Sequence, residues 1–327
     1  MACLPTFTVV IPIRRGSPVP HAAQSVRNVD YPQELIEIVL VEGANPSLQR
    51  NAGIQSANGE LIYLLDDDSV LSLKAMRYAV ECFAEHPEPH LVCVGGPVLT
   101  IASDTPFQKA VGAAMGSVFG LGPNRHRHVS YGLVRSTTEK ELISANMVLR
   151  RVALDRAGGF DERIYPNEEN EFLKRVQYAG MGCMYHPLVV VFGSRRKNLW
   201  QVFVQNFCYG RGRAQHYFKN IRAIDAVFWA PTLLLLSFVA CALWPRWYTA
   251  LPVGFYTLMT FFVAAFIGLA MRHTIRSFFY LLLIFPFMHL SYGIGFLAGF
   301  VRIGLKRRKI DRNVIVRRIR ELGDTCE

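Results

Sequence analysis

Three adjacent aspartates, Asp66, Asp67 and Asp68, follow directly after the apolar run Leu61–Leu65 in the stretch GELIYLLDDDSVLS. A short apolar run that ends in polar residues predicts a strand buried on both faces. Three like charges at its exit repel one another, and two roles would offset that cost. The carboxylates can bind a hard divalent cation, or Asp68 or Ser69 can cap a helix that begins a few residues later. The stretch alone leaves both open.

A second acidic cluster, Glu168, Glu169 and Glu171, lies in the stretch YPNEENEFLKR. The pattern after it is helical, and Asn167 stands where a helix cap is expected. Glutamates in the first turn favour the positive end of the helix dipole, so a purely structural role accounts for the cluster as well as a chemical one does.

Strand and helix patterns alternate over the first hundred residues. Strand-like runs at 7–13, 35–41, 61–65 and 90–98 are separated by helix-like segments at 21–29, 47–57 and 72–85. This order predicts an α/β fold with a doubly wound, mostly parallel, Rossmann-like sheet, which binds ligands beyond the carboxyl ends of its strands. The aspartate triplet, Glu42 and the turn Gly95-Gly96-Pro97 each follow a strand, so we expect them on one rim of the sheet.

The apolar excess of the chain of 327 residues lies towards its end. Hydrophobic residues make up 51% of the sequence, which is high for a soluble protein. The runs 226–244, 248–271 and 277–301 approach or reach the roughly 20 residues that a membrane helix needs. The first apolar run, near the N-terminus, turns polar after a few residues and predicts a strand rather than a signal peptide. We therefore expect a soluble domain followed by an α-helical transmembrane module.

The formal net charge of +11 is concentrated beside these apolar runs. The basic residues there are Arg195, Arg196, Lys197, Arg211, Arg213, Lys306, Arg307, Arg308, Lys309, Arg312, Arg317, Arg318 and Arg320. This placement predicts anionic membrane lipids on the cytoplasmic side as the partner, and no nucleic acid. Seven cysteines without a C-x-x-C pair argue against a zinc site and against a disulfide framework.

Four segments follow from these patterns. They are a soluble domain at 1–197, an amphipathic interface helix with an arginine-containing loop at 198–222, two or three transmembrane helices at 223–304, and a basic cytoplasmic tail at 305–327. In the second segment Leu199, Trp200, Phe203, Val204, Phe207 and Cys208 form an apolar stripe, which suits either a membrane interface or packing on the soluble domain. Three full crossings would place the basic tail outside. We expect a broken, re-entrant third segment at Pro286 and a tail inside.

Three stretches in this order resemble landmarks of the family 2 glycosyltransferases with a GT-A fold. They are LQRNAGIQSANGELIYLLDDDSV, SANMVLRRVALDRAGGFDERIYPNEENEFLKRVQYAG and QNFCYGRGRAQ. The resemblance covers about residues 5–215 and is nearest to membrane-attached bacterial enzymes of succinoglycan-type exopolysaccharide synthesis. It implies a metal-dependent enzyme that transfers a sugar, expected to be a hexose, from a nucleotide-sugar.

The resemblance also implies roles on the donor side. Asp66 and Asp68 match the family's D-x-D motif, which holds Mg²⁺ or Mn²⁺ against the donor diphosphate, and hard cations do prefer carboxylate oxygens. Further residues expected to contact the nucleotide-sugar are Pro12, Glu42, Arg50, Asp67 and Gly96. Glu42 stands where the family has an aspartate that meets the nucleobase. Arg50 is expected at the diphosphate, unless it is simply a solvated helical arginine.

On the acceptor side, Glu169 aligns with the family's catalytic aspartate. An inverting transfer needs a carboxylate that takes the proton of the acceptor hydroxyl, with Glu168 as the rival for this role. Arg211 and Arg213 resemble a degenerate Q-x-x-R-W element, and the nearby glycines predict a loop that lets these guanidinium groups contact a phosphate.

Three lesser features leave alternatives open. Asn146 is expected on a strand near the acceptor, or in a turn-side hydrogen bond. His186 follows a strand and is expected to be structural rather than a ligand. The stretch NRHRH at 124–128 predicts a mobile flap or a phosphate contact.

Together these features predict an inverting glycosyltransferase, multi-pass in the cytoplasmic (inner) membrane with its catalytic domain in the cytoplasm, acting on a lipid-linked or growing glycan acceptor. Two other classes remain. One is a non-catalytic glycan-export or assembly subunit that only binds a sugar nucleotide. The other is a nucleotidyltransferase, for which RRGSPVP is a poor match to a glycine-rich phosphate loop.

Overall fold

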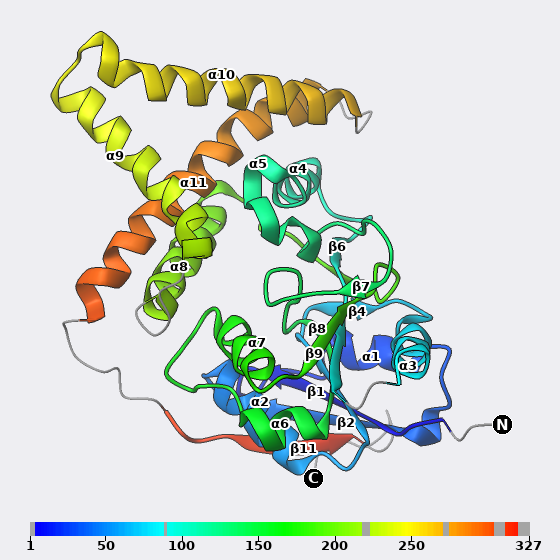
Figure 1. The fold of residues 1–327 in the computed structure, drawn as a ribbon. Helices are drawn as coiled ribbons and strands as arrows, with labels where there is room; N and C mark the ends of the chain where they lie inside the picture. Colours follow the sequence, from blue (N-terminus) through cyan, green and yellow to red (C-terminus); the bar gives the residue numbers. More distant parts are fainter. Residues whose placement is uncertain (1–3, 88–89, 218–222, 271–274, 304–310, 320–327) are drawn as a thin grey trace. The chain divides into compact units, whose positions relative to one another are not determined.

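The computed structural model describes residues 4–87, 90–217, 223–270, 275–303 and 311–319 (Figure 1). The chain divides into two compact units. The first comprises Met1–Ile101, Pro123–Ser194 and Lys309–Glu327, and the second comprises Ala102–Gly122 and Arg195–Arg308. The residues 102–122, which we expected inside the catalytic domain, thus group with the apolar helices. Lys219, Arg272, the basic run 306–309, Arg320 and Cys326 lie outside the described residues.

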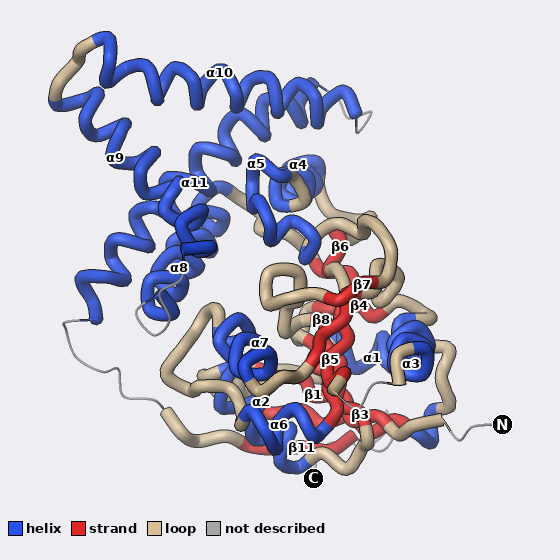
Figure 2. Tube along the Cα trace, in the orientation of Figure 1, coloured by secondary structure: helices blue, strands red, loops and turns tan. Residues whose placement is uncertain are grey.

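An eight-stranded mixed sheet forms the centre of the first unit, in the order β11-β2-β1-β3-β8-β5-β9-β7. Figure 2 shows the strands in red. Its strands are β1 Phe7–Ile13, β2 Ile36–Glu42, β3 Leu61–Leu65, β5 Leu91–Gly95, β7 Arg135–Ser136, β8 Asn146–Arg150, β9 Gly182–Tyr185 and β11 Ile315–Ile319. β1 runs parallel to β2 and β3, β9 runs parallel to β5, and β8 lies antiparallel between β3 and β5. The strands β1, β2, β3, β5 and β9 therefore end at one edge of the sheet.

Helices cover both faces of this sheet. α1 (His21–Arg27) and α3 (Ala75–Glu85) pack on one face, and α2 (Pro46–Ser56), α6 (Arg151–Ala157) and α7 (Glu168–Tyr178) pack on the other. Along β1 the buried side chains alternate between the two cores, with Val9 in one and Val10 in the other. A short 3₁₀ helix, η1 (Gln33–Leu35), precedes β2. The predicted doubly wound α/β fold is confirmed.

A three-stranded sheet lies beside the end of β3. It consists of β4 (Ser69–Leu71), β10 (Val191–Gly193) and β6 (Val98–Thr100), with β4 antiparallel and β6 parallel to β10. The expectation that Asp68 or Ser69 caps a helix is therefore wrong, because Ser69 begins β4 and the next helix starts at Ala75. The hydrogen bonds of β4 come from β10, which is far away in the sequence.

The second unit is helical. Its elements are α4 (Pro106–Met115), α5 (Val118–Leu121), α8 (Leu199–Tyr217), η3 (Ala223–Trp229), α9 (Ala230–Leu243), α10 (Trp247–Ala270) and α11 (Ile275–Ile303), while η2 (Gly122–Arg127) follows α5 into the first unit. Within the described residues three spans are long and apolar enough to cross a membrane: Ala226–Leu243, Trp247–Ala270 and Ile275–Val301. α4 joins this unit because Ala110, Val111 and Met115 pack in one core with α11.

Glycines let α8 and α11 approach each other closely. A Cβ at Gly210 would overlap the carbonyl oxygen of Tyr292, and a Cβ at Gly295 would overlap that of Phe207. The predicted loop at Arg211 and Arg213 is therefore wrong, since both arginines lie inside α8. The glycines there allow helix packing rather than a turn. α11 is likewise one helix across Pro286, so the predicted break at this residue is also wrong.

The chain returns to the first unit after the apolar helices. β11 pairs antiparallel with β2 over five residues, from Ile315 opposite Glu42 to Ile319 opposite Ile38. Part of the predicted basic tail is thus an edge strand of the central sheet. Its two arginines, Arg317 and Arg318, pair with glutamates of β2.

Candidate functional site

The rim at the carboxyl ends of the parallel strands carries most of the predicted site. The residues that end these strands are Ile13, Glu42, Leu65, Gly95 and Tyr185, and β8 begins at the same edge because Asn146 lies opposite Leu65. Ligands of doubly wound sheets bind beyond such ends. The expectation that the aspartate triplet, Glu42 and Gly96 share one rim is met by this register.

The aspartate triplet forms the turn between β3 of the large sheet and β4 of the small one. The Ser69 amide donates to the carbonyl oxygen of Asp66 at 3.1 Å, which keeps the turn tight. The Asp66 carboxylate is 41% exposed, Asp67 is half-buried and Asp68 is exposed. Burial and the neighbouring Asp66 charge raise the pKa of Asp67. The turn thus leaves the Asp66 and Asp68 side chains at least partly accessible at the rim.

Arg50 of α2 connects the two acidic clusters. Its Nη2 donates to Asp66 Oδ1 at 2.8 Å and its Nη1 donates to Glu168 Oε1 at 2.6 Å. The residue is 3% exposed, so the alternative of a solvated helical arginine is wrong. The predicted contact with the diphosphate stays a prediction.

Glu168 and Glu169 begin α7 and are both buried. Burial, followed by the charge of Glu169, raises the pKa of Glu168 to about 7, and Arg50 opposes this only in part. Glu168 Oε2 is a buried atom without a hydrogen-bond partner among the described residues. Since unpaired buried oxygens are costly, this atom is a ready acceptor for a donor group on a ligand.

Arg127 holds Glu169, a contact that sequence reasoning missed. Its Nη1 donates to Glu169 Oε1 at 3.0 Å, and its Nη2 donates to Asn170 Oδ1 and to the carbonyl oxygen of Glu139. The stretch 124–128, interpreted as a flap or a phosphate contact, mostly belongs to η2, and Arg127 within it is buried. Arg127 and Glu169 thus form a buried ion pair at the start of α7.

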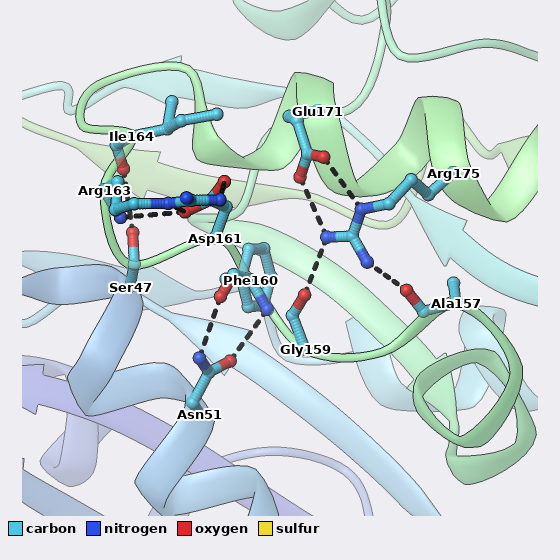
Figure 3. Close-up of polar contacts among 10 residues, drawn as sticks. All are labelled: Ser47, Asn51, Ala157, Gly159, Phe160, Asp161, Arg163, Ile164, Glu171 and Arg175. Atoms are coloured by element: carbon cyan, nitrogen blue, oxygen red, sulfur yellow. Dashed lines mark hydrogen bonds and ion pairs between the residues drawn. The ribbon is translucent and has the colours of Figure 1, made fainter.

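Hydrogen bonds from α2 and from α7 hold the loop 158–167 that leads into α7 (Figure 3). Asn51 of α2 donates to the carbonyl oxygen of Phe160 and accepts from its amide, and Ser47 donates to the carbonyl oxygen of Ile164. Arg175 pairs with Glu171 at 2.8 Å and also donates to the carbonyl oxygens of Ala157 and Gly159. Glu171 is thus engaged in a structural ion pair rather than offered to a ligand.

Asn167 precedes α7 but does not cap it with its side chain. Its φ is 81°, in the left-handed region, and no side-chain cap hydrogen bond forms. Its Oδ1 accepts from Asn170 instead, at 3.0 Å. Asn167 therefore occupies the predicted N-cap position, but its side chain does not cap the helix. The two buried glutamates that follow it lie at the positive end of the helix dipole.

The remaining rim residues are packed into the protein. Asn146 is buried, accepts from the Tyr63 hydroxyl at 2.7 Å and donates to two carbonyl oxygens, so it has a structural role. His186 stacks on Tyr78 at 5.5 Å between ring centroids, as its predicted structural role requires. A Cβ at Gly96 would overlap the carbonyl oxygen of Val189, so glycine is needed for close backbone packing here.

Four more predicted site residues are Pro12 and Glu42, in the first unit, and Arg211 and Arg213, in α8. Pro12 of β1 is half-buried opposite Val41, and Glu42 is buried. Arg211 and Arg213 belong to the second unit, where Arg213 is buried with its guanidinium 4.0 Å from the centre of the Phe228 ring. The structure therefore brings together Asp66, Arg50, Glu168, Glu169 and Arg127, all in the first unit.

The oxygen ligands fit a divalent cation only in part. Across the described part of the chain, no group of three or more His, Cys, Asp or Glu side chains is placed to hold a metal ion. Asp66 and Asp68 offer hard carboxylate oxygens at one turn, which suits Mg²⁺ or Mn²⁺ completed by oxygens of a bound diphosphate and by water. This donor set does not suit zinc, which prefers nitrogen and sulfur ligands.

Comparisons with known proteins place this arrangement in a fold family. No family model matches the sequence. The mannosyltransferase PcManGT from Pyrobaculum calidifontis, solved in complex with GDP-Man and Mn²⁺, superimposes with a TM-score of 0.58 over 91% of this chain and 88% of that one, at 14% identity. The chain has the GT-A glycosyltransferase fold. S. aureus TarS gives a TM-score of 0.43 at 11% identity, over 67% of this chain and 44% of that one.

This GT-A chain also has a relative in sequence. It is 27% identical over 216 residues to the succinoglycan biosynthesis protein ExoA of Rhizobium meliloti (strain 1021). The match covers 64% of this chain and spans 63% of that protein's length. The predicted resemblance to succinoglycan-type proteins is confirmed at this level, and the apolar helices are consistent with membrane attachment.

Proposed function

We propose that this protein is an inverting glycosyltransferase that moves a sugar from a nucleotide-sugar to a lipid-linked or growing glycan acceptor. The observation that carries the proposal is the chain of ion pairs from Asp66 through Arg50 to Glu168, beside the Glu169–Arg127 pair, at the ligand-binding rim of a GT-A sheet. A purely structural acidic turn would not require the two buried glutamates, Glu168 and Glu169, beside it.

The donor side consists of the turn 66–68. Asp66 and Asp68 would hold Mg²⁺ or Mn²⁺, which when bound offsets the negative charge of a departing diphosphate. Arg50 keeps Asp66 oriented towards the rim through its 2.8 Å hydrogen bond. The similar fold of a mannosyltransferase that was solved with GDP-Man and Mn²⁺ supports a nucleotide-sugar as the donor.

The acceptor side consists of the start of α7. The oxygen of the acceptor hydroxyl attacks the anomeric carbon of the donor sugar, and the donor diphosphate leaves. Glu169 takes the proton of that hydroxyl during the attack. Arg127 holds the Glu169 carboxylate in place before the reaction. Glu168 accepts a hydrogen bond from Arg50 and so links the two glutamates, Glu168 and Glu169, to the donor side.

A panel of nucleotide-sugars tests the function. We expect the purified full chain with Mn²⁺ to be stabilised against heat by one donor among UDP-glucose, UDP-galactose and GDP-mannose, and to hydrolyse that donor slowly. A ligand present at 100 times its Kd stabilises the folded state by about 2.7 kcal/mol, which a melting curve resolves. Stabilisation without hydrolysis would favour the binding subunit. The absence of both with every donor would contradict the proposal.

The return of the chain to the central sheet limits its membrane topology. β11 and β2 exchange hydrogen bonds within one sheet, so both lie on the same side of a bilayer. The helices between them therefore make an even number of full crossings. Half of the most apolar 18 residues of α11 are buried inside the second unit, against 11% for α9 and for α10. We infer that α9 and α10 cross fully, that α11 does not, and that residues 311–319 are cytoplasmic.

Cysteine labelling in intact cells checks this topology. A cysteine placed by Arg312→Cys should stay unlabelled by a membrane-impermeant thiol reagent until the cells are opened. A matched cysteine from Arg246→Cys, between α9 and α10, should be labelled in intact cells. The unmodified chain sets the background from its native cysteines. Labelling at position 312 from outside would rule out the even number of crossings.

A further inference from the structure

The residues just before β11 contact two of the turns that follow the parallel strands. Arg15, in the turn after β1, donates to the carbonyl oxygen of Asn313 at 2.8 Å and pairs with Asp311 at 3.2 Å. In the turn after β2, a Cβ at Gly43 would lie 3.2 Å from Val314 Cγ1. A segment that follows the apolar helices therefore packs directly on the rim of the first unit.

Arg317 makes the central contact of this segment. Its Nη2 lies 2.9 Å from Glu42 Oε1, and Glu42 Oε2 accepts from the Gly16 amide at 3.3 Å. The Glu42 side chain is almost fully buried, so these two contacts take the place of water at its carboxylate. Glu42 thus bridges Arg317 on β11 to the turn after β1. Its carboxylate was expected to face a nucleobase. Oε1 is ion-paired with Arg317 but has no hydrogen-bond partner among the described residues, and Oε2 accepts from the Gly16 amide.

The turn that Glu42 holds lies beside the aspartate triplet. The Ala22 amide, in the first turn of α1 six residues after Gly16, donates to the carbonyl oxygen of Asp67 at 3.5 Å. The positive charge of Arg14, the first residue of the turn, also acts on the Asp67 carboxylate. A shift of the turn would therefore move groups that border the proposed donor site.

We propose that Arg317 is a positioning residue of the donor site: through Glu42 it fixes the turn 14–16 against which the nucleoside diphosphate of the donor binds. This inference rests on the proposed function. β11, the strand that follows the apolar helices, then helps to position the residues of the donor site.

The neighbouring Arg318 provides a matched control. Successive residues of a strand point to opposite faces, and Arg318 pairs with Glu37 at 3.3 Å near the other end of β2. It also donates to the carbonyl oxygen of Ser56 at 2.6 Å, away from the rim. Arg317→Gln and Arg318→Gln remove the same charge from the same strand, and only the first should disturb the donor site.

Binding of UDP and GDP to the purified full chain, with Mn²⁺ and measured by calorimetry, tests the proposal. For the nucleotide that binds the wild type, Arg317→Gln should raise Kd about tenfold, Arg317→Lys should restore much of the affinity, and Arg318→Gln should stay within about twofold. In turnover assays the KM for the donor should rise for Arg317→Gln while kcat changes little. A merely structural strand would give the same modest effect for both glutamine variants and would overturn the proposal.

Two further results separate the possible failures. Glu42→Gln combined with Arg317→Gln should weaken binding no more than either single change, because both act through one contact. Additive losses would overturn the positioning role. If the wild type binds neither UDP nor GDP and no nucleotide-sugar stabilises it, the proposed function itself fails, and the inference fails with it. Melting curves confirm that each variant is folded.

Discussion

Asp66→Asn and Asp68→Asn should each lower metal-dependent donor turnover at least about 100-fold, which corresponds to about 2.7 kcal/mol of lost transition-state stabilisation. The amide has the shape of the carboxylate but is a far weaker ligand for a hard cation. In the Asp66→Asn variant the amide oxygen would still accept the hydrogen bond from Arg50, so the fold should persist. Turnover at saturating donor, titrated with Mn²⁺, measures the effect.

The control is a surface carboxylate of the same unit. Asp30 pairs with Arg77 at 2.8 Å and both side chains are about as exposed as that of Asp66. Asp30→Asn should leave turnover and its Mn²⁺ dependence unchanged. Near-normal turnover in both triplet variants would remove the metal assignment, whereas loss in only one would reduce it to a single carboxylate.

The position of the aspartate triplet at the rim could be predicted because it is encoded locally. An apolar run buried on both faces must be a central strand, and polar residues directly after it must reach the rim where such folds bind ligands. Leu61–Leu65 and the triplet satisfy this rule in the structure. The cap interpretation failed because β4 has only three residues, and its partner β10 lies far along the chain.

The partners of the acidic side chains could not be predicted from local patterns. Arg50 and Glu168 are 118 positions apart, and Arg127 and Glu169 are 42 positions apart. Hydrophobic periodicity indicates which face of an element is buried, but not which buried charge meets which. For this reason Arg50 was interpreted as a diphosphate contact or a solvated arginine, and Arg127 was placed in a flap.

The loop predicted at Gly210 and Gly212 is part of the helix α8. Gly210 and Gly212 next to arginines suggest a turn when only neighbours in the sequence are considered, because glycine weakens helices. In the structure Gly210 and Gly295 bring α8 and α11 into close contact, a use of small residues that is common between membrane helices. The edge strand β11 was missed for a related reason: its charged sequence resembles a solvated tail, and its order comes from pairing with β2.

Glu169→Gln should slow sugar transfer at least about 100-fold, a loss within the usual range for removal of a general base. The Kd for the donor should stay within about twofold. The amide cannot take the acceptor proton, yet its oxygen can still accept from Arg127. Glu171→Gln is the matched control, because this third glutamate of the cluster pairs with Arg175 and should tolerate the change within about twofold. Single-turnover transfer with pre-bound donor separates chemistry from binding.

The pH profile distinguishes Glu169 from its rival. The pKa of Glu168 is raised to about 7, so its pairing with Arg50 is complete above that pH and is lost as the pH falls below it. If Glu168 only couples the two sides, the wild-type rate should rise through about pH 7. Glu168→Gln should then retain roughly a tenth of the rate at pH 8, a loss of about 1.4 kcal/mol, with no step near pH 7. If Glu168→Gln is instead the dead variant and Glu169→Gln keeps a measurable rate with the step intact, Glu168 is the base and Arg127 serves only to hold α7.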